Sequence, residues 1–145
     1  MEVANNNKWL QRTTVFARYL NLLRQYNTVN DAISSLLPEQ RRSIALTALA
    51  ELTRAETSDQ EPLVTEATNW SVEAAVAFAR VRSPHSAIRL AGLKRWLVCA
   101  YRATFNSPYG EVQNLHRLVL RALRQMHGEE QAKASELRRD QRRFA

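Results

Sequence analysis

Apolar residues recur at helical spacing along almost the whole of this 145-residue chain, and this period most restricts what the chain can fold into. No stretch sustains the alternation of apolar and polar residues that is typical of a half-buried strand. The chain has only three glycines and four prolines, which leaves little material for hairpin turns. We therefore predict an all-α, compact single-domain bundle of about five to seven helices, the last two long and basic on their outer faces.

The predicted helices fall into two parts. The N-terminal part has helices near residues 8–26, 28–37 and 38–55, and in the first of them Trp9, Phe16, Leu20 and Leu23 share one stripe. A polar, acidic linker near residues 56–62 follows, and the C-terminal basic part comes after it. We expect residues 1–128 to form one helical domain and residues 129–145 to form a charged C-terminal helix extension or tail.

The C-terminal part begins with a short predicted helix near residues 62–68 and a longer one over residues 69–81. In the longer helix, small and apolar residues form a strip that indicates a central position, and these are Val72, Ala75, Val76 and Ala79. Two similar start signals follow, Ser83-Pro84 and Ser107-Pro108, each with serine as the N-cap and proline as the first helical residue. Gly128 occupies the position expected for the C-cap of the last long helix.

Positive charge is concentrated in the C-terminal part. Residues 80–128 carry nine basic residues and one acidic residue, Glu111, whereas residues 1–79 carry seven basic and nine acidic residues. Arginine outnumbers lysine 18 to 3, and the planar guanidinium group binds phosphate or carboxylate through two hydrogen bonds. This segregation predicts a polyanionic partner.

The basic residues form stripes on the last two long helices. Arg117, Arg121 and Arg124 have spacings that place them on one face, opposite the predicted core residues of their helix. The candidate nucleic-acid or acidic-partner site comprises these three together with Arg89, Lys94, Arg95 and Arg102. An alternative stays open, in which the stripes are neutralised by acidic residues of the chain itself, namely Glu51, Glu56, Asp59, Glu61, Glu66 and Glu73.

Aromatic residues could add stacking contacts with bases. The candidates are Trp9, Trp70, Trp96, Tyr101, Phe105 and Tyr109. We single out Trp96, beside Arg95, as a half-exposed ring for stacking or for an interface. The alternative for Trp96 is a position in the core or in a protein contact.

The sequence contains no catalytic motif, so we expect a non-enzymatic protein without catalytic residues, metal site or cofactor. His116 and His127 are too far apart along one helix to share a metal ion, and no pair of cysteines and histidines has metal-binding spacing. Cys99, the only cysteine, lies in an apolar run where it is expected to pack as a small apolar residue.

These features favour a nucleic-acid-binding protein that contacts the phosphate backbone of RNA or DNA with low sequence specificity. The alternative is a helical protein–protein interaction or assembly module that binds an acidic partner or forms a homodimer. A third hypothesis is binding to the surface of an anionic membrane. The absence of a signal peptide and of a long apolar run predicts a soluble, cytoplasmic protein without a membrane span.

Overall fold

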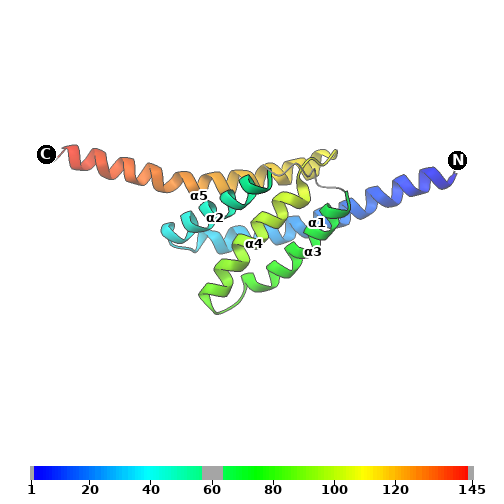
Figure 1. The fold of residues 1–145 in the computed structure, drawn as a ribbon, viewed down its shortest axis with the longest axis horizontal. Helices are drawn as coiled ribbons and strands as arrows, with labels where there is room; N and C mark the ends of the chain where they lie inside the picture. The colour runs from blue at the N-terminus through cyan, green and yellow to red at the C-terminus, as the bar shows by residue number, and fades with distance from the viewer. Residues whose placement is uncertain (1, 57–63, 144–145) are drawn as a thin grey trace.

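Five helices make up the described part of the chain (Figure 1). The computed structural model describes the backbone of residues 2–56 and 64–143 and the side chains of residues 14–54 and 69–128. The helices are α1 (Glu2–Ser34), α2 (Pro38–Glu56), α3 (Val64–Val81), α4 (Ser86–Thr104) and α5 (Gly110–Arg143). No strand occurs within the described backbone, so the predicted all-α bundle is confirmed. Most of the predicted linker lies outside the described residues.

α1 is one continuous helix where the sequence predicted two. The prediction of a separate helix near residues 28–37 was wrong, because α1 continues through Asn27 and Thr28 to Ser34. Val29 is fully buried and Ile33 is 7% exposed, so this stretch packs against the rest of the bundle. Burial of such a side chain contributes about 1.5–3 kcal/mol, which exceeds the helix-propensity cost of below about 1 kcal/mol for asparagine or threonine.

The face of α1 that packs also differs from the predicted stripe. Leu22, Val29 and Ile33 are buried, whereas Phe16 and Leu20 are 37% and 46% exposed. Of the other two residues of the predicted stripe, Leu23 is half-buried against the core, and the side chain of Trp9 lies outside the described residues. Both sets are apolar and both have helical spacing, so the period alone indicates two candidate faces. The position of α1 against the other helices decides which face is covered.

α2 begins at Pro38, as predicted. The N–H of Leu37 donates to Oε1 of Gln40 at 3.1 Å, and the N–H of Arg41 donates to the carbonyl of Leu37 at the same distance. The glutamine side chain therefore satisfies the backbone N–H that precedes the helix, which is one half of a capping box. Proline at the first helical position has no N–H that would otherwise lack a partner.

α3 and α4 pack antiparallel, and their backbones approach each other closely at Gly92. A Cβ atom at this glycine would lie 2.8 Å from Cβ of Arg80 and 3.1 Å from the carbonyl oxygen of Ala77. No real side chain tolerates the first of these distances without displacement of its neighbour. The absence of a side chain at Gly92 therefore sets the separation of the two helices.

α3 uses a different face for this packing from the predicted one. Ala74, Ala77 and Val81 are buried, and they belong to one uninterrupted helix rather than to two. The predicted strip of Val72, Ala75, Val76 and Ala79 is exposed, with Val72 at 58% and Val76 at 49%. The prediction that this strip packs was wrong, because α3 carries apolar residues on two faces and α4 covers the other one.

The two Ser-Pro sequences share one local structure, which lies before each helix rather than inside it. Oγ of Ser83 accepts a hydrogen bond from the N–H of His85, and Oγ of Ser107 accepts one from the N–H of Tyr109. α4 and α5 begin one residue later, so serine is not the N-cap and proline is not the first helical residue. A serine hydroxyl that binds the backbone two residues later forms a turn, and here this turn competes with direct capping.

α5 is longer than predicted and passes through Gly128 to Arg143. The predicted C-cap at Gly128 was wrong, since an interior glycine costs a helix only about 0.5–1 kcal/mol relative to alanine. The segment after Gly128 is therefore a helix extension. Figure 1 shows that the end of α5 and the start of α1 extend beyond the bundle at opposite ends.

α4 is the central helix of the bundle. It contacts all four other helices, and in its second half almost every side chain is buried. Trp96 is its largest fully buried side chain. Because α4 contacts every other helix, its basic residues lie beside different neighbours, with Lys94 near Glu51 of α2 and Arg95 near Glu73 of α3.

Candidate nucleic-acid interface

The three arginines of α5 lie on its exposed face. Arg117, Arg121 and Arg124 are all exposed, and the apolar residues on the other side of the helix are buried: Val112, Leu115, Val119, Leu123 and Met126. Among the residues whose side chains are described, none forms an ion pair with these three arginines. We call Arg117, Arg121 and Arg124 the α5 triad.

Arg121 of the α5 triad lies close to Tyr26 of α1. Burial raises the pKa of Tyr26 in α1, and the nearby Arg121 guanidinium partly offsets this effect by lowering the pKa. Tyr26 also packs against Trp96, with ring centroids 6.3 Å apart. One edge of the α5 triad is therefore bordered by the aromatic residues between α1 and α4.

The basic residues of α4 have partners within the protein. Nζ of Lys94 lies 3.4 Å from Oε2 of Glu51, and Nη2 of Arg95 lies 3.7 Å from Oε2 of Glu73. Arg89 donates from Nη1 to the carbonyl of Ser83 at 3.5 Å. Two carboxylates from the acidic first half of the chain thus neutralise Lys94 and Arg95, as the alternative based on the sequence proposed.

Trp70, rather than Trp96, is the tryptophan that contacts the basic residues. The guanidinium carbons of Arg102 and Arg95 lie 4.5 Å and 5.5 Å from the centroid of the Trp70 ring. These distances are within the range of cation–π attraction. No pattern in the sequence indicates this cluster, because Trp70 and the arginines come from different helices and meet only through the packing of α3 on α4.

Trp96 is completely buried, so the prediction of a half-exposed stacking ring was wrong. Its Nε1–H donates to Oε1 of Gln25 at 2.9 Å, which satisfies the polar group of the indole inside the bundle. The physical reason is that α1 covers the side of α4 on which Trp96 lies. Trp96 is a core residue and is not available to a base.

The α5 triad and the arginines beside Trp70 lie on different sides of α4. Arg95 and Thr104 are nine residues apart on α4, which is two and a half helical turns and places them on opposite faces. Arg95 faces Trp70 of α3, whereas Oγ1 of Thr104 lies 3.0 Å from Nδ1 of His116 of α5. Figure 1 accordingly shows α4 between α3 and α5. The α5 triad and the arginines beside Trp70 are therefore separate surfaces.

His116 and Cys99 have structural roles. The ring of His116 packs on Tyr101 with centroids 4.3 Å apart, and its Nδ1 lies 3.2 Å from the carbonyl of Tyr101. Within the described residues, no group of three histidine, cysteine or acidic side chains could hold a metal ion. Burial raises the pKa of Cys99 from its ordinary 9.0 to about 11, so at neutral pH its thiol is protonated and unreactive.

The raised pKa of Cys99 predicts a loss of stability in alkaline solution. The folded thiol keeps its proton up to about pH 11 and the unfolded thiol loses it near pH 9.0, so rising pH favours the unfolded state across this interval. The full loss of stability is about 3 kcal/mol, since the pKa rises by about two units and each unit corresponds to about 1.4 kcal/mol. Urea denaturation of the wild type and of Cys99→Ala between pH 8 and 11 checks this, because only the wild type shows this loss. Parallel pH profiles for the two proteins would contradict it.

Within the described residues, no helix is long and apolar enough to cross a membrane. Comparisons of the chain with protein-family models, with curated proteins and with solved structures found no match.

Proposed function

We propose that this chain is a non-enzymatic nucleic-acid-binding protein that contacts the phosphate backbone of RNA or DNA through the α5 triad. The observation that carries the proposal is the contrast between the two basic helices. Lys94 and Arg95 of α4 have carboxylate partners at 3.4 and 3.7 Å, whereas Arg117, Arg121 and Arg124 are exposed without one among the described side chains.

This contrast weakens the competing explanation of the basic stripe. Like charges three or four residues apart on a helix destabilise it by about 0.2–0.5 kcal/mol per pair. Of the six acids named as candidates, Glu51 and Glu73 are engaged by α4. The side chains of the other four lie outside the described residues: Glu56, Asp59, Glu61 and Glu66. Phosphates of a bound nucleic acid would neutralise the α5 triad from outside and release the counterions of the nucleic acid.

The contacts offered by the α5 triad fit binding with low sequence specificity. Guanidinium groups on an exposed helix face bind phosphate oxygens and fix the position of the protein without reading bases. Trp96, the ring that was predicted from the sequence to add stacking, is buried. If each arginine contacts one phosphate of a duplex, the α5 triad adds about −2.7 to the slope of log K against log salt.

Charge reversal tests the proposal. We expect Arg117→Glu, Arg121→Glu and Arg124→Glu together to reduce affinity for a mixed-sequence DNA or RNA duplex at 50 mM salt by at least about tenfold and to flatten its salt dependence. Fluorescence anisotropy at several salt concentrations measures both quantities. All three side chains are exposed, so circular dichroism should report an unchanged fold.

The matched control compares two double variants with the same net charge. The first double variant combines Arg117→Glu with Arg124→Glu, and the second combines Arg42→Glu with Arg54→Glu. Each lowers the formal charge from +7 to +3, and all four residues are exposed. Only the first pair should lose most of its binding. Equal losses would mean that total charge, rather than the α5 triad, determines affinity, and no binding of the wild type at 50 mM salt would refute the proposal.

One observation supports the alternative function, contact with another protein. The exposed strip on α3 contains Val72 and Val76, at 58% and 49% exposure, and Phe16 and Leu20 of α1 are exposed as well. Light scattering separates the two functions, because a mass near twice 16.7 kDa without affinity for nucleic acid would favour self-association.

A further inference from the structure

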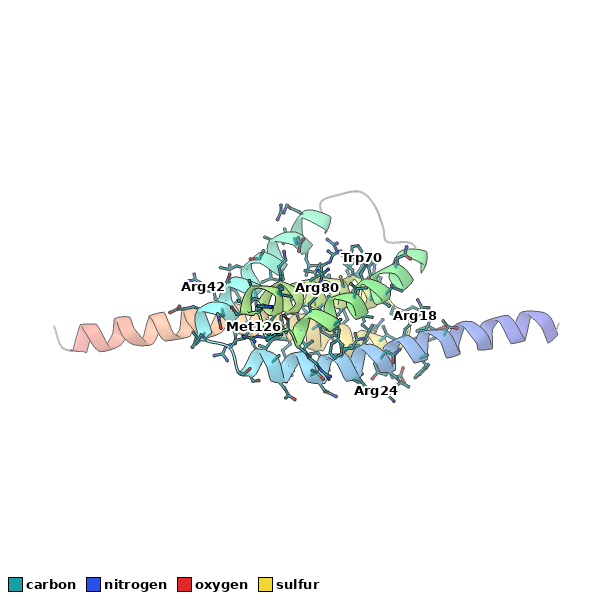
Figure 2. All side chains as sticks on the ribbon, turned by 90° about the horizontal axis from the view of Figure 1, so that it is seen from below. Arg18, Arg24, Arg42, Trp70, Arg80 and Met126 are labelled. Atoms are coloured by element: carbon teal, nitrogen blue, oxygen red, sulfur yellow. The ribbon has the colours of Figure 1, made fainter. Side chains whose placement is uncertain are left out.

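A second group of arginines lies along the groove between α3 and α4. Arg95 and Arg102 of α4 flank Trp70 of α3, and the close approach of Gly92 to the Cβ of Arg80 places Arg80 on the same line of contact. Figure 2 shows Trp70 and Arg80 along α3, whereas Arg24 extends from the side of α1 that is turned away from α3 in this view. We call Arg80, Arg95 and Arg102 the groove cluster.

The groove cluster has an excess of positive charge. Among the described side chains, one carboxylate pairs with its three arginines. This is Glu73, which lies 3.7 Å from Arg95 and whose side chain is 50% exposed. Arg80 is exposed and Arg102 is half-buried. Two unit charges therefore remain on this surface without a carboxylate partner among the described side chains.

The contact with Trp70 restricts the side chain of Arg102 before any anion binds. A guanidinium carbon 4.5 Å from the ring centroid is close enough for the guanidinium to lie against the indole, and this contact restricts the long arginine side chain. The N–H groups lie at the edge of the guanidinium plane and can still donate two hydrogen bonds to one phosphate. A restricted arginine loses less conformational entropy when it binds.

The groove cluster and the α5 triad face away from each other. Arg95 lies on the face of α4 opposite Thr104, and Thr104 contacts His116 of α5, so the central helix separates the two surfaces. A nucleic-acid segment bound on α5 would not cover the groove between α3 and α4. Both surfaces can therefore be occupied at the same time.

We propose that one molecule of this protein binds two nucleic-acid segments at once, one through the α5 triad and the other through the groove cluster, and so bridges them. This inference rests on the proposed function, and it adds a second surface and a bridging activity. Simple binding needs one basic surface, whereas bridging by a single chain needs two that point in different directions.

A capture experiment tests bridging. A 30-base-pair DNA duplex is immobilised, the protein is bound at 50 mM salt, unbound protein is removed, and a fluorescent duplex of unrelated sequence is added. We expect the wild type to retain the fluorescent duplex, and Arg80→Glu with Arg102→Glu to retain at least about tenfold less while still binding the immobilised duplex. An RNA duplex in a parallel arm compares the two sources of phosphate.

The outcomes separate the two proposals. Failure of the wild type to bind the immobilised duplex refutes the proposed function and bridging together. Binding without capture of the second duplex refutes bridging alone. Capture that survives Arg80→Glu with Arg102→Glu also refutes it, because the second duplex is then held elsewhere, for example by a second copy of the chain. Arg80→Gln with Arg102→Gln repeats the test without adding negative charge.

Discussion

Replacement of Trp96 by alanine is expected to lower the free energy of unfolding by about 3–5 kcal/mol. Trp96 is the largest fully buried side chain, and it lies on the central helix, where its loss would leave a cavity facing α1. The indole N–H also donates to Gln25 at 2.9 Å, and this bond would be lost. The change is large against the total of about 5–15 kcal/mol that stabilises a typical domain.

Urea denaturation followed by circular dichroism measures this effect. Trp96→Phe retains a buried ring and loses mainly the hydrogen bond to Gln25, so it should cost less than Trp96→Ala and provides a folded reference. The control is Ile88→Ala, because Ile88 is 45% exposed and its truncation should have a much smaller effect. A loss below about 1 kcal/mol for Trp96→Ala, within the range of ordinary surface changes, would show that Trp96 is not buried.

Two glycine-to-alanine substitutions are expected to change stability in opposite directions. Gly92→Ala should destabilise the protein by about 1–3 kcal/mol, because the new Cβ would meet Cβ of Arg80 at 2.8 Å and the backbone of Ala77 at 3.1 Å. These atoms belong to the α3 backbone or are fixed to it, so α3 and α4 would have to move apart. Overpacking outweighs the gain in helix propensity of about 0.5–1 kcal/mol.

Gly128→Ala is the matched control for the same chemical change. Gly128 lies inside α5, and a Cβ there meets nothing within 4 Å. Only the gain in helix propensity remains, so this variant should be more stable by about 0.5–1 kcal/mol. Thermal denaturation of the two variants compares them directly. If Gly92→Ala were as stable as Gly128→Ala, the close approach of α3 and α4 would be wrong.

Several features of the fold follow from local chemistry and could be predicted. Pro38 begins α2 because a proline at the first helical position lacks only an N–H that has no helical partner there. The faces of α5 were also predictable, since its apolar residues lie on one side only and Arg117, Arg121 and Arg124 lie on the other. In such a helix the sequence leaves a single way to bury the apolar side chains.

In helices with two apolar faces, the face that packs could not be predicted in the same way. α1 has one stripe through Leu22 and Val29 and another through Phe16 and Leu20, and α3 likewise has Ala74 and Val76 on different faces. Periodicity identifies both stripes and does not rank them. The neighbours that cover one stripe come from distant parts of the sequence, so only packing selects it.

The sequence by itself determined that the chain is helical and that its C-terminal part is basic, because helical period and charge are properties of local sequence. Only the tertiary structure decided which charges are neutralised and which aromatic ring contacts them. Glu51 reaches Lys94, and Trp70 reaches Arg102, because α2 and α3 both pack against α4. Electrostatic and cation–π attraction act over a few ångströms, and residues more than thirty positions apart come within that range only when the bundle forms.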